Sequence, residues 1–124
     1  MGLNIGIDYG HTITDYPEYF SQLTKYLRGW GCKIHIISGM PPPVEVSKDL
    51  IKAELRRYKI DWDYLDVHND REHTTEDKHK GKYCLEHKID LMFDDDNKPG
   101  GYIEDIRKWS PLTKIIVVKE IKNL

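Results

Sequence analysis

The sequence has little cysteine, no long hydrophobic run and no excess of charge of one sign. Its 124 residues include two cysteines, Cys32 and Cys84, which are too few for a disulfide framework. No apolar run approaches the roughly 20 residues that span a bilayer, and 19 Lys and Arg oppose 21 Asp and Glu. We therefore expect a cytoplasmic protein that does not cross a membrane and carries no strong signal for nucleic-acid binding.

What is present is the composition of a folded domain. Hydrophobic residues make up 39% of the chain and charged residues 32%, which is usual for a globular protein. The length suits one hydrophobic core and is too short for two. No repeat or low-complexity linker divides the chain, so we predict a single domain over residues 1–124.

Short apolar stretches alternate with amphipathic stretches along the chain. The apolar stretches predict strands over residues 3–7, 33–37, 64–68, 89–93 and 115–118. Apolar residues at helical spacing predict helices that begin near residues 17, 46, 74 and 102 and end near residues 29, 58, 88 and 109. Ser38 and Gly39 are expected to stop the second strand. The alternation predicts an α/β fold with three Rossmann-like layers, in which helices cover both faces of a mostly parallel five-stranded sheet.

Polar residues follow three of the predicted strands, at the place where open α/β sheets bind their ligands. Asp8 comes after the first strand, Ser38 after the second, and the acidic run Asp94, Asp95 and Asp96 after the fourth. Carboxylates gathered in one place repel one another unless a cation balances them. Because the donors are oxygens without a supporting Cys and His cluster, the pattern favours Mg²⁺ over zinc.

A positive side chain near these carboxylates would complete a site for phosphoryl chemistry, which needs positive charge on the oxygens of the transferred group. Lys78, Lys80 and Lys82 lie in the helix expected just before the acidic run. A helix in that position can direct one of them back to the carboxyl ends of the strands. The spacing does not choose among the three lysines.

Three segments, taken together, resemble the haloacid dehalogenase superfamily. Residues 5–12 (IGIDYGHT) are similar to the first motif of that family, an apolar strand followed by Asp-x-Asp-x-Thr. Residues 26–39 resemble its first helix and its second motif, which ends in Ser or Thr, and residues 80–95 resemble its third and fourth motifs joined. The resemblance covers nearly the whole chain and implies a small phosphatase-like or nucleotidase-like member without a cap domain.

The resemblance also implies a role for each matching residue. Asp8 would be the nucleophile that attacks phosphorus and forms an aspartyl-phosphate. The ligands of Mg²⁺ would be Asp8, Asp94, Asp95 and the backbone carbonyl of Gly10. The phosphoryl group would be bound by Ser38 and Gly39, by backbone N–H groups around Gly10 and His11, and by Lys80, with Lys78 as the second choice.

One position departs from the pattern of the family. Its phosphatases carry a second aspartate two residues after the nucleophile, and here that residue is Gly10. The aspartate protonates the leaving group and then activates water, and general acid–base catalysis of this kind contributes about 10²–10⁴-fold. The neighbouring His11 is the candidate to replace it. Without such a replacement, the catalytic activity is weak or absent.

These inferences predict an Mg²⁺-dependent phosphohydrolase that acts on a phosphorylated small molecule, a nucleotide or a phosphorylated polymer end. Without a cap domain the site is open, so either a bulky substrate occupies it or a second copy of the chain covers it in a homo-oligomer. Tyr9, His11 and Tyr16 are candidates to stack on a base or sugar.

Two other interpretations stay open. A domain of the same fold that binds Mg²⁺ and phosphate without turnover differs from the enzyme in one visible feature, Gly10. The segment IGIDYG also resembles the opening strand of RNase H-like nucleases, whose chain continues through a hairpin into an antiparallel second strand. A zinc site is not expected, because the gaps between the available donors fit none of the usual paired spacings; these donors are His73, His79, Cys84 and His87.

Overall fold

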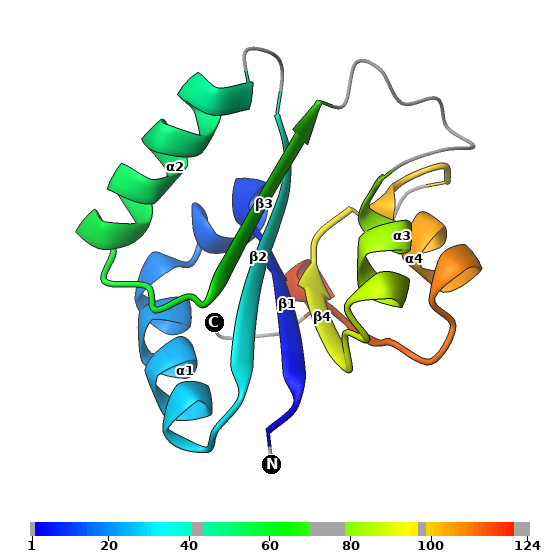
Figure 1. The fold of residues 1–124 in the computed structure, drawn as a ribbon, viewed down its shortest axis with the longest axis horizontal. Coiled ribbons are helices and arrows are strands. Elements are labelled where there is room, and N and C mark those ends of the chain that lie inside the picture. Colours follow the sequence, from blue (N-terminus) through cyan, green and yellow to red (C-terminus); the bar gives the residue numbers. More distant parts are fainter. Residues whose placement is uncertain (1, 41–43, 70–78, 97–98, 121–124) are drawn as a thin grey trace.

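The computed structural model describes residues 2–40, 44–69, 79–96 and 99–120. Strands and helices alternate along these residues (Figure 1). The strands are β1 (Asn4–Asp8), β2 (Lys33–Met40), β3 (Tyr64–Asn69), β4 (Leu91–Asp94) and β5 (Lys114–Val117). The helices are α1 (Pro17–Gly29), α2 (Val44–Arg57), α3 (His79–Glu86) and α4 (Tyr102–Trp109), with the short turns η1 (Tyr9–Ile13) and η3 (Val118–Glu120). None of these helices is long and apolar enough to cross a bilayer.

The five strands form one sheet in the order β3-β2-β1-β4-β5. Every neighbouring pair is parallel, which confirms the predicted α/β fold class. Strands β2 and β3 are added on one side of β1, and β4 and β5 are then added on its other side. The strand order therefore reverses between β1 and β4, and ligands bind at such a reversal in open α/β sheets.

Helices cover both faces of the sheet, so the molecule has three layers. Figure 1 shows α1 and α2 on one side of the strands and α3 and α4 on the other. Each face has its own core: Phe20 of α1 and Leu55 of α2 pack with Ile36 of β2, whereas Cys84 of α3 packs with Ile37 of β2 on the opposite face. Because successive strand residues point to opposite faces, the apolar run of β2 is buried by both layers.

Helix α3 packs closely against α4 because it contains a glycine at the contact. A β-carbon at Gly81 would lie 2.6 Å from the backbone oxygen of Asp105, too close for any other residue to fit without movement. The backbone N–H of Gly81 also donates to Asp105 Oδ2 at 2.8 Å. This contact determines where the first turn of α3, including Lys80, lies relative to the sheet.

Two expectations from the sequence are wrong. Strand β2 does not stop at Ser38 and Gly39, because β3 pairs beside it as far as Met40 and supplies the missing backbone partners. The nuclease interpretation needs an antiparallel second strand, and β2 is parallel to β1. The predicted start of the helix near residue 74 lies outside the described residues.

Candidate functional site

Two carboxylates and a lysine meet at the end of the sheet where the parallel strands have their C-terminal residues. Asp8 is the last residue of β1 and Asp94 the last residue of β4, so both lie where the strand order reverses. Lys80, in the first turn of α3, is fully buried, and its Nζ donates to Asp8 Oδ1 at 2.8 Å and to Asp94 Oδ2 at 3.0 Å. The ammonium group bridges two carboxylates that would otherwise repel one another.

Burial and neighbouring charges together determine the pKa values in this cluster. Burial raises the pKa of Asp8 well above its usual value, and the negative charge of Asp94 adds to this effect while the Lys80 ammonium opposes it. Burial alone would lower the pKa of Lys80, but the two carboxylates outweigh burial and raise it. When both carboxylates are ionised, the cluster has one negative charge more than positive. A cation beside Asp8 would therefore favour its ionised form.

Asp95 and Thr12 extend the cluster and supply further oxygens. The hydroxyl of Thr12 lies 3.2 Å from Asp8 Oδ2 and 3.3 Å from Asp95 Oδ1. One carboxylate oxygen from each of Asp8, Asp94 and Asp95 lies within 4.8 Å of the others. Mg²⁺ is usually held by a few carboxylate oxygens and keeps several of its waters. The oxygens present here fit the ion that the sequence predicts.

A pocket of about 240 Å³ opens beside the carboxylates. It is lined by residues from four separate parts of the chain, namely Asp8, Gly10, His11, Ser38, Gly39, Asp95, Asp96 and Tyr102. Lys80 does not line the pocket but is buried behind it in the sense that its Nζ donates to Asp8, which does line it. Lys82 lies with its Nζ 5.0 Å from the ring centre of Trp109, and Lys78 lies outside the described residues. Lys80 is thus the lysine that the described structure places at the site.

Gly10 and His11 form the loop that follows the proposed nucleophile. Gly10 has φ −68° and ψ 133°, a conformation open to any residue, and a β-carbon there would meet nothing within 4 Å. His11 has a left-handed φ of 59° and an exposed side chain at the pocket. Its backbone N–H donates to Thr14 Oγ1 at 2.9 Å. That amide is therefore already bonded, rather than free for a phosphoryl oxygen as the resemblance implies.

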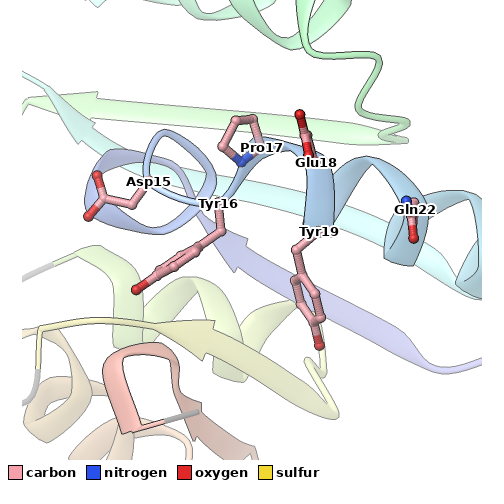
Figure 2. Close-up of a pocket in the computed structure, with 6 residues that line it drawn as sticks. All are labelled: Asp15, Tyr16, Pro17, Glu18, Tyr19 and Gln22. Atoms are coloured by element: carbon pink, nitrogen blue, oxygen red, sulfur yellow. The ribbon is translucent and has the colours of Figure 1, made fainter. Parts of the chain in front are cut away.

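The aromatic side chains predicted to stack on a base or sugar lie in different places. Tyr9 is buried in the core, where its hydroxyl donates to Glu54, so it does not line the pocket. Tyr16 lines a second pocket, of about 450 Å³, at the start of α1. Figure 2 shows the rings of Tyr16 and Tyr19 extending to the same side of that segment. Of the three candidates, His11 alone lines the pocket beside Asp8.

Tyr102 is a site residue that the sequence did not reveal. Lys80 Nζ lies 4.0 Å from its ring centre, which is the geometry of a cation–π contact. Its backbone N–H donates to Asp96 Oδ2 at 3.1 Å, which connects the start of α4 to the acidic run. Nothing in the spacing distinguishes this tyrosine from the other aromatic residues that begin or end helices.

Comparison with known proteins finds chains of similar fold but gives no evidence about function. No protein-family model matches the sequence, and no curated protein does. A chain of the solved Pnkp1/Rnl/Hen1 RNA repair complex is similar in structure, with a TM-score of 0.65 and 14% identity over 93% of this chain and 41% of that one. A universal stress protein in complex with cAMP has a TM-score of 0.57 and 11% identity, over 94% of this chain and 95% of its own. At these identities the similarity shows the fold alone.

Proposed function

We propose that this chain is an Mg²⁺-dependent phosphohydrolase of the haloacid dehalogenase type, with Asp8 as its nucleophile. The observation that most supports this proposal is the buried bridge that Lys80 makes between Asp8 and Asp94, where Asp8 lines a pocket. Burying charged groups is unfavourable for folding. Phosphoryl transfer, however, uses such a pre-positioned set of charges.

The reaction has two steps at Asp8. First, a carboxylate oxygen of Asp8 attacks phosphorus, the bond from phosphorus to the leaving oxygen breaks, and the leaving oxygen takes up a proton. Water then attacks the aspartyl-phosphate, the bond between phosphorus and Asp8 breaks, and inorganic phosphate leaves with the carboxylate regenerated. Lys80 balances charge on Asp8 throughout, and Ser38 with Gly39 lies where phosphoryl oxygens would be bound.

Bound Mg²⁺ would neutralise charge on the phosphoryl oxygens and help to orient them. Asp8, Asp94 and Asp95 would hold it with the carbonyl of Gly10. The chain has no carboxylate at Gly10 to move the proton of the leaving group. The exposed imidazole of His11 lines the same pocket and is the candidate for this role. If His11 does not act, turnover is limited to substrates with good leaving groups.

The substrate is a phosphorylated small molecule, a nucleotide or a phosphorylated polymer end, in the cytoplasm. The similarity to a chain of an RNA repair complex makes a phosphorylated RNA end the polymer to test first. A homo-oligomer would cover the open pocket when the substrate is small. A second candidate function, binding of Mg²⁺ and phosphate without turnover, is favoured by the glycine at position 10.

The first test measures Mg²⁺-dependent release of phosphate from p-nitrophenyl phosphate, nucleotides and a phosphorylated RNA oligonucleotide. We expect Asp8→Asn to lower the rate at least about 10³-fold, since it removes the attacking oxygen while keeping the side-chain shape. Asp49→Asn, an exposed carboxylate on α2, is the matched control and should retain the wild-type rate. A rate unchanged by Asp8→Asn would contradict the proposal.

The second test restores the missing aspartate. The backbone at Gly10 accepts any residue and the space beside it is open, so Gly10→Asp should fold normally. We expect it to raise the rate by about 10²–10⁴-fold, the usual contribution of general acid–base catalysis. Turnover in Gly10→Asp with none in the wild type would favour the binding function. A fast wild type whose rate Gly10→Asp does not raise would mean that His11 already supplies the proton. In that case His11→Gln should abolish the phosphatase activity.

A further inference from the structure

A second group of metal-ligating side chains lies at the end of β3 and the start of α3, apart from the carboxylates of the proposed phosphohydrolase site. Asp66 and His68 are two residues apart on β3, so both side chains point to the same face of the sheet. His79 is the first residue of α3. Asp66 Oδ2 lies 3.4 Å from His68 Nδ1 and 3.1 Å from His79 Nε2, so two imidazole rings converge on one carboxylate oxygen.

The distances from Asp66 Oδ2 to the two imidazole nitrogens are compatible with hydrogen bonds and also with ligands of one metal ion. Metal–ligand bonds of 2.0–2.1 Å in a tetrahedron separate neighbouring ligand atoms by about 3.3 Å. The two separations measured here lie on either side of that value, and one ligand atom from each residue lies within 4.8 Å of the others. A small shift of the side chains would place all three atoms around one ion.

One residue of the cluster is buried and the other two are part-exposed. The side chain of His68 is 7% exposed, that of Asp66 25% and that of His79 33%. Burial alone would raise the pKa of Asp66, but hydrogen bonding to the two histidines outweighs burial and holds this pKa well below its usual range.

The chemistry of the donors separates this cluster from the one around Asp8. Two imidazole nitrogens and one carboxylate oxygen suit Zn²⁺ and its neighbours in the first transition series, whereas oxygen donors alone suit Mg²⁺. Three protein ligands also leave a fourth position for water or another ligand, as in many zinc sites.

We propose that Asp66, His68 and His79 bind one divalent transition-metal ion, with Zn²⁺ the preferred ion. The ion joins the end of β3 to the first turn of α3, next to Lys80 in the sequence, and so adds a second constraint to the turn that the contact of Gly81 with α4 already places. The sequence predicts no zinc site because the usual zinc motifs have two ligands close together on one segment. Here the ligands come from two elements, and the only local signal is the alternation Asp66-x-His68 on a strand.

The test is a titration of the full chain with Co²⁺, whose visible absorption reports nitrogen ligands and low coordination number. Excess Mg²⁺ is present throughout to occupy oxygen-only sites. We expect one Co²⁺ per chain, displaced by one equivalent of Zn²⁺, and binding weakened more than about 100-fold by His68→Gln, Asp66→Asn or His79→Gln. His79 is part-exposed at the first position of α3, so His79→Gln should remain folded even if Asp66→Asn and His68→Gln do not.

His87→Gln is the matched control, since His87 is exposed and lies outside the cluster. It should bind Co²⁺ as tightly as the wild type. Zn²⁺ at a hundredfold excess over its Kd should also raise the Tm of the wild type by about 10 °C, and that of His79→Gln should not rise. Absence of Co²⁺ absorption in the wild type, or binding that His79→Gln leaves unchanged, would overturn the proposal. Neither result depends on whether the chain hydrolyses phosphate.

Discussion

The sheet carries two sets of buried polar side chains that are built in different ways. At its carboxyl edge, Lys80 lies between Asp8 and Asp94, and three ionisable groups share one buried position. Nearer the start of β2, the buried His35 is a neutral ring in a closed set of hydrogen bonds. Its Nε2 donates to Asn4 Oδ1 at 3.1 Å, and its Nδ1 accepts from the hydroxyl of Tyr83 at 2.8 Å.

The two sets differ in how completely their polar groups are paired with one another. Around His35 each donor meets an acceptor, and burial lowers the pKa of the ring to about 4, so it stays neutral at pH 7. Around Lys80 two carboxylates share one ammonium group beside an open pocket, so the charges balance only when Asp8 holds a proton, the form that its raised pKa favours. The closed neutral set needs no further partner, whereas a cation beside the Lys80 set would favour the ionised form of Asp8.

Removal of the lysine should have the largest effect on stability. Lys80→Met leaves Asp8 and Asp94 buried without a balancing charge, so we expect it to lower the free energy of unfolding by about 3–5 kcal/mol, measured by urea denaturation without divalent metal. Adding Asp8→Asn and Asp94→Asn to Lys80→Met should recover most of that loss. Lys114→Met, an exposed lysine on β5, is the control and should change stability by less than about 0.5 kcal/mol. Equal stability of Lys80→Met and the wild type would mean that the cluster is not charged as described.

Acid should destabilise the neutral set by a smaller amount. The unfolded chain protonates His35 near pH 6.5 and the folded chain only near pH 4. Between these values the unfolded state binds the additional proton, so stability falls as the pH falls. We expect this histidine to contribute about 3 kcal/mol to that decrease. The measurement is urea denaturation of the wild type and His35→Gln at several pH values from 7 to 4. Two parallel pH profiles would contradict the assignment.

The smallest effect should come from the hydroxyl of Tyr83. Tyr83→Phe keeps the ring but leaves His35 Nδ1 without its donor, which costs about 1 kcal/mol for a buried hydrogen bond. In the His35→Gln background the same change should have a different effect, because the two side chains share one bond. Tyr26→Phe on α1, at an exposed position, should be neutral. Thermal unfolding of the four variants and the wild type makes this comparison, and additive effects would show that the bond contributes nothing.

Much of the fold could be predicted from local patterns. Helix α4 spans the residues 102–109 that its apolar spacing predicts, and the alternation of short apolar and amphipathic segments predicts the parallel sheet. The end of β2 could not be predicted, because Ser38 and Gly39 are in the strand only through their pairing with β3. That pairing joins distant parts of the chain and leaves no local signal.

The site was predictable where it depends on strand ends and less so where it depends on helix packing. Asp8 and Asp94 were expected at the same sheet edge because both end parallel strands. The choice of Lys80 among three lysines depends on the rotation of α3, which the contact of Gly81 with α4 determines. Tyr9 was expected beside the ligand, but the turn after β1 buries its ring and brings its hydroxyl to Glu54.

The open space beside Gly10 has a consequence for how this protein can change. A glycine codon whose third base is a pyrimidine becomes an aspartate codon by a single base substitution. Because the backbone there suits any residue and no atom would clash with the new side chain, that substitution meets no barrier from folding. If Asp8 is the nucleophile as proposed, a slow or silent form and a fast form of this chain therefore differ by a single base substitution. Selection on activity alone, without compensating changes elsewhere, would decide which of them a population keeps.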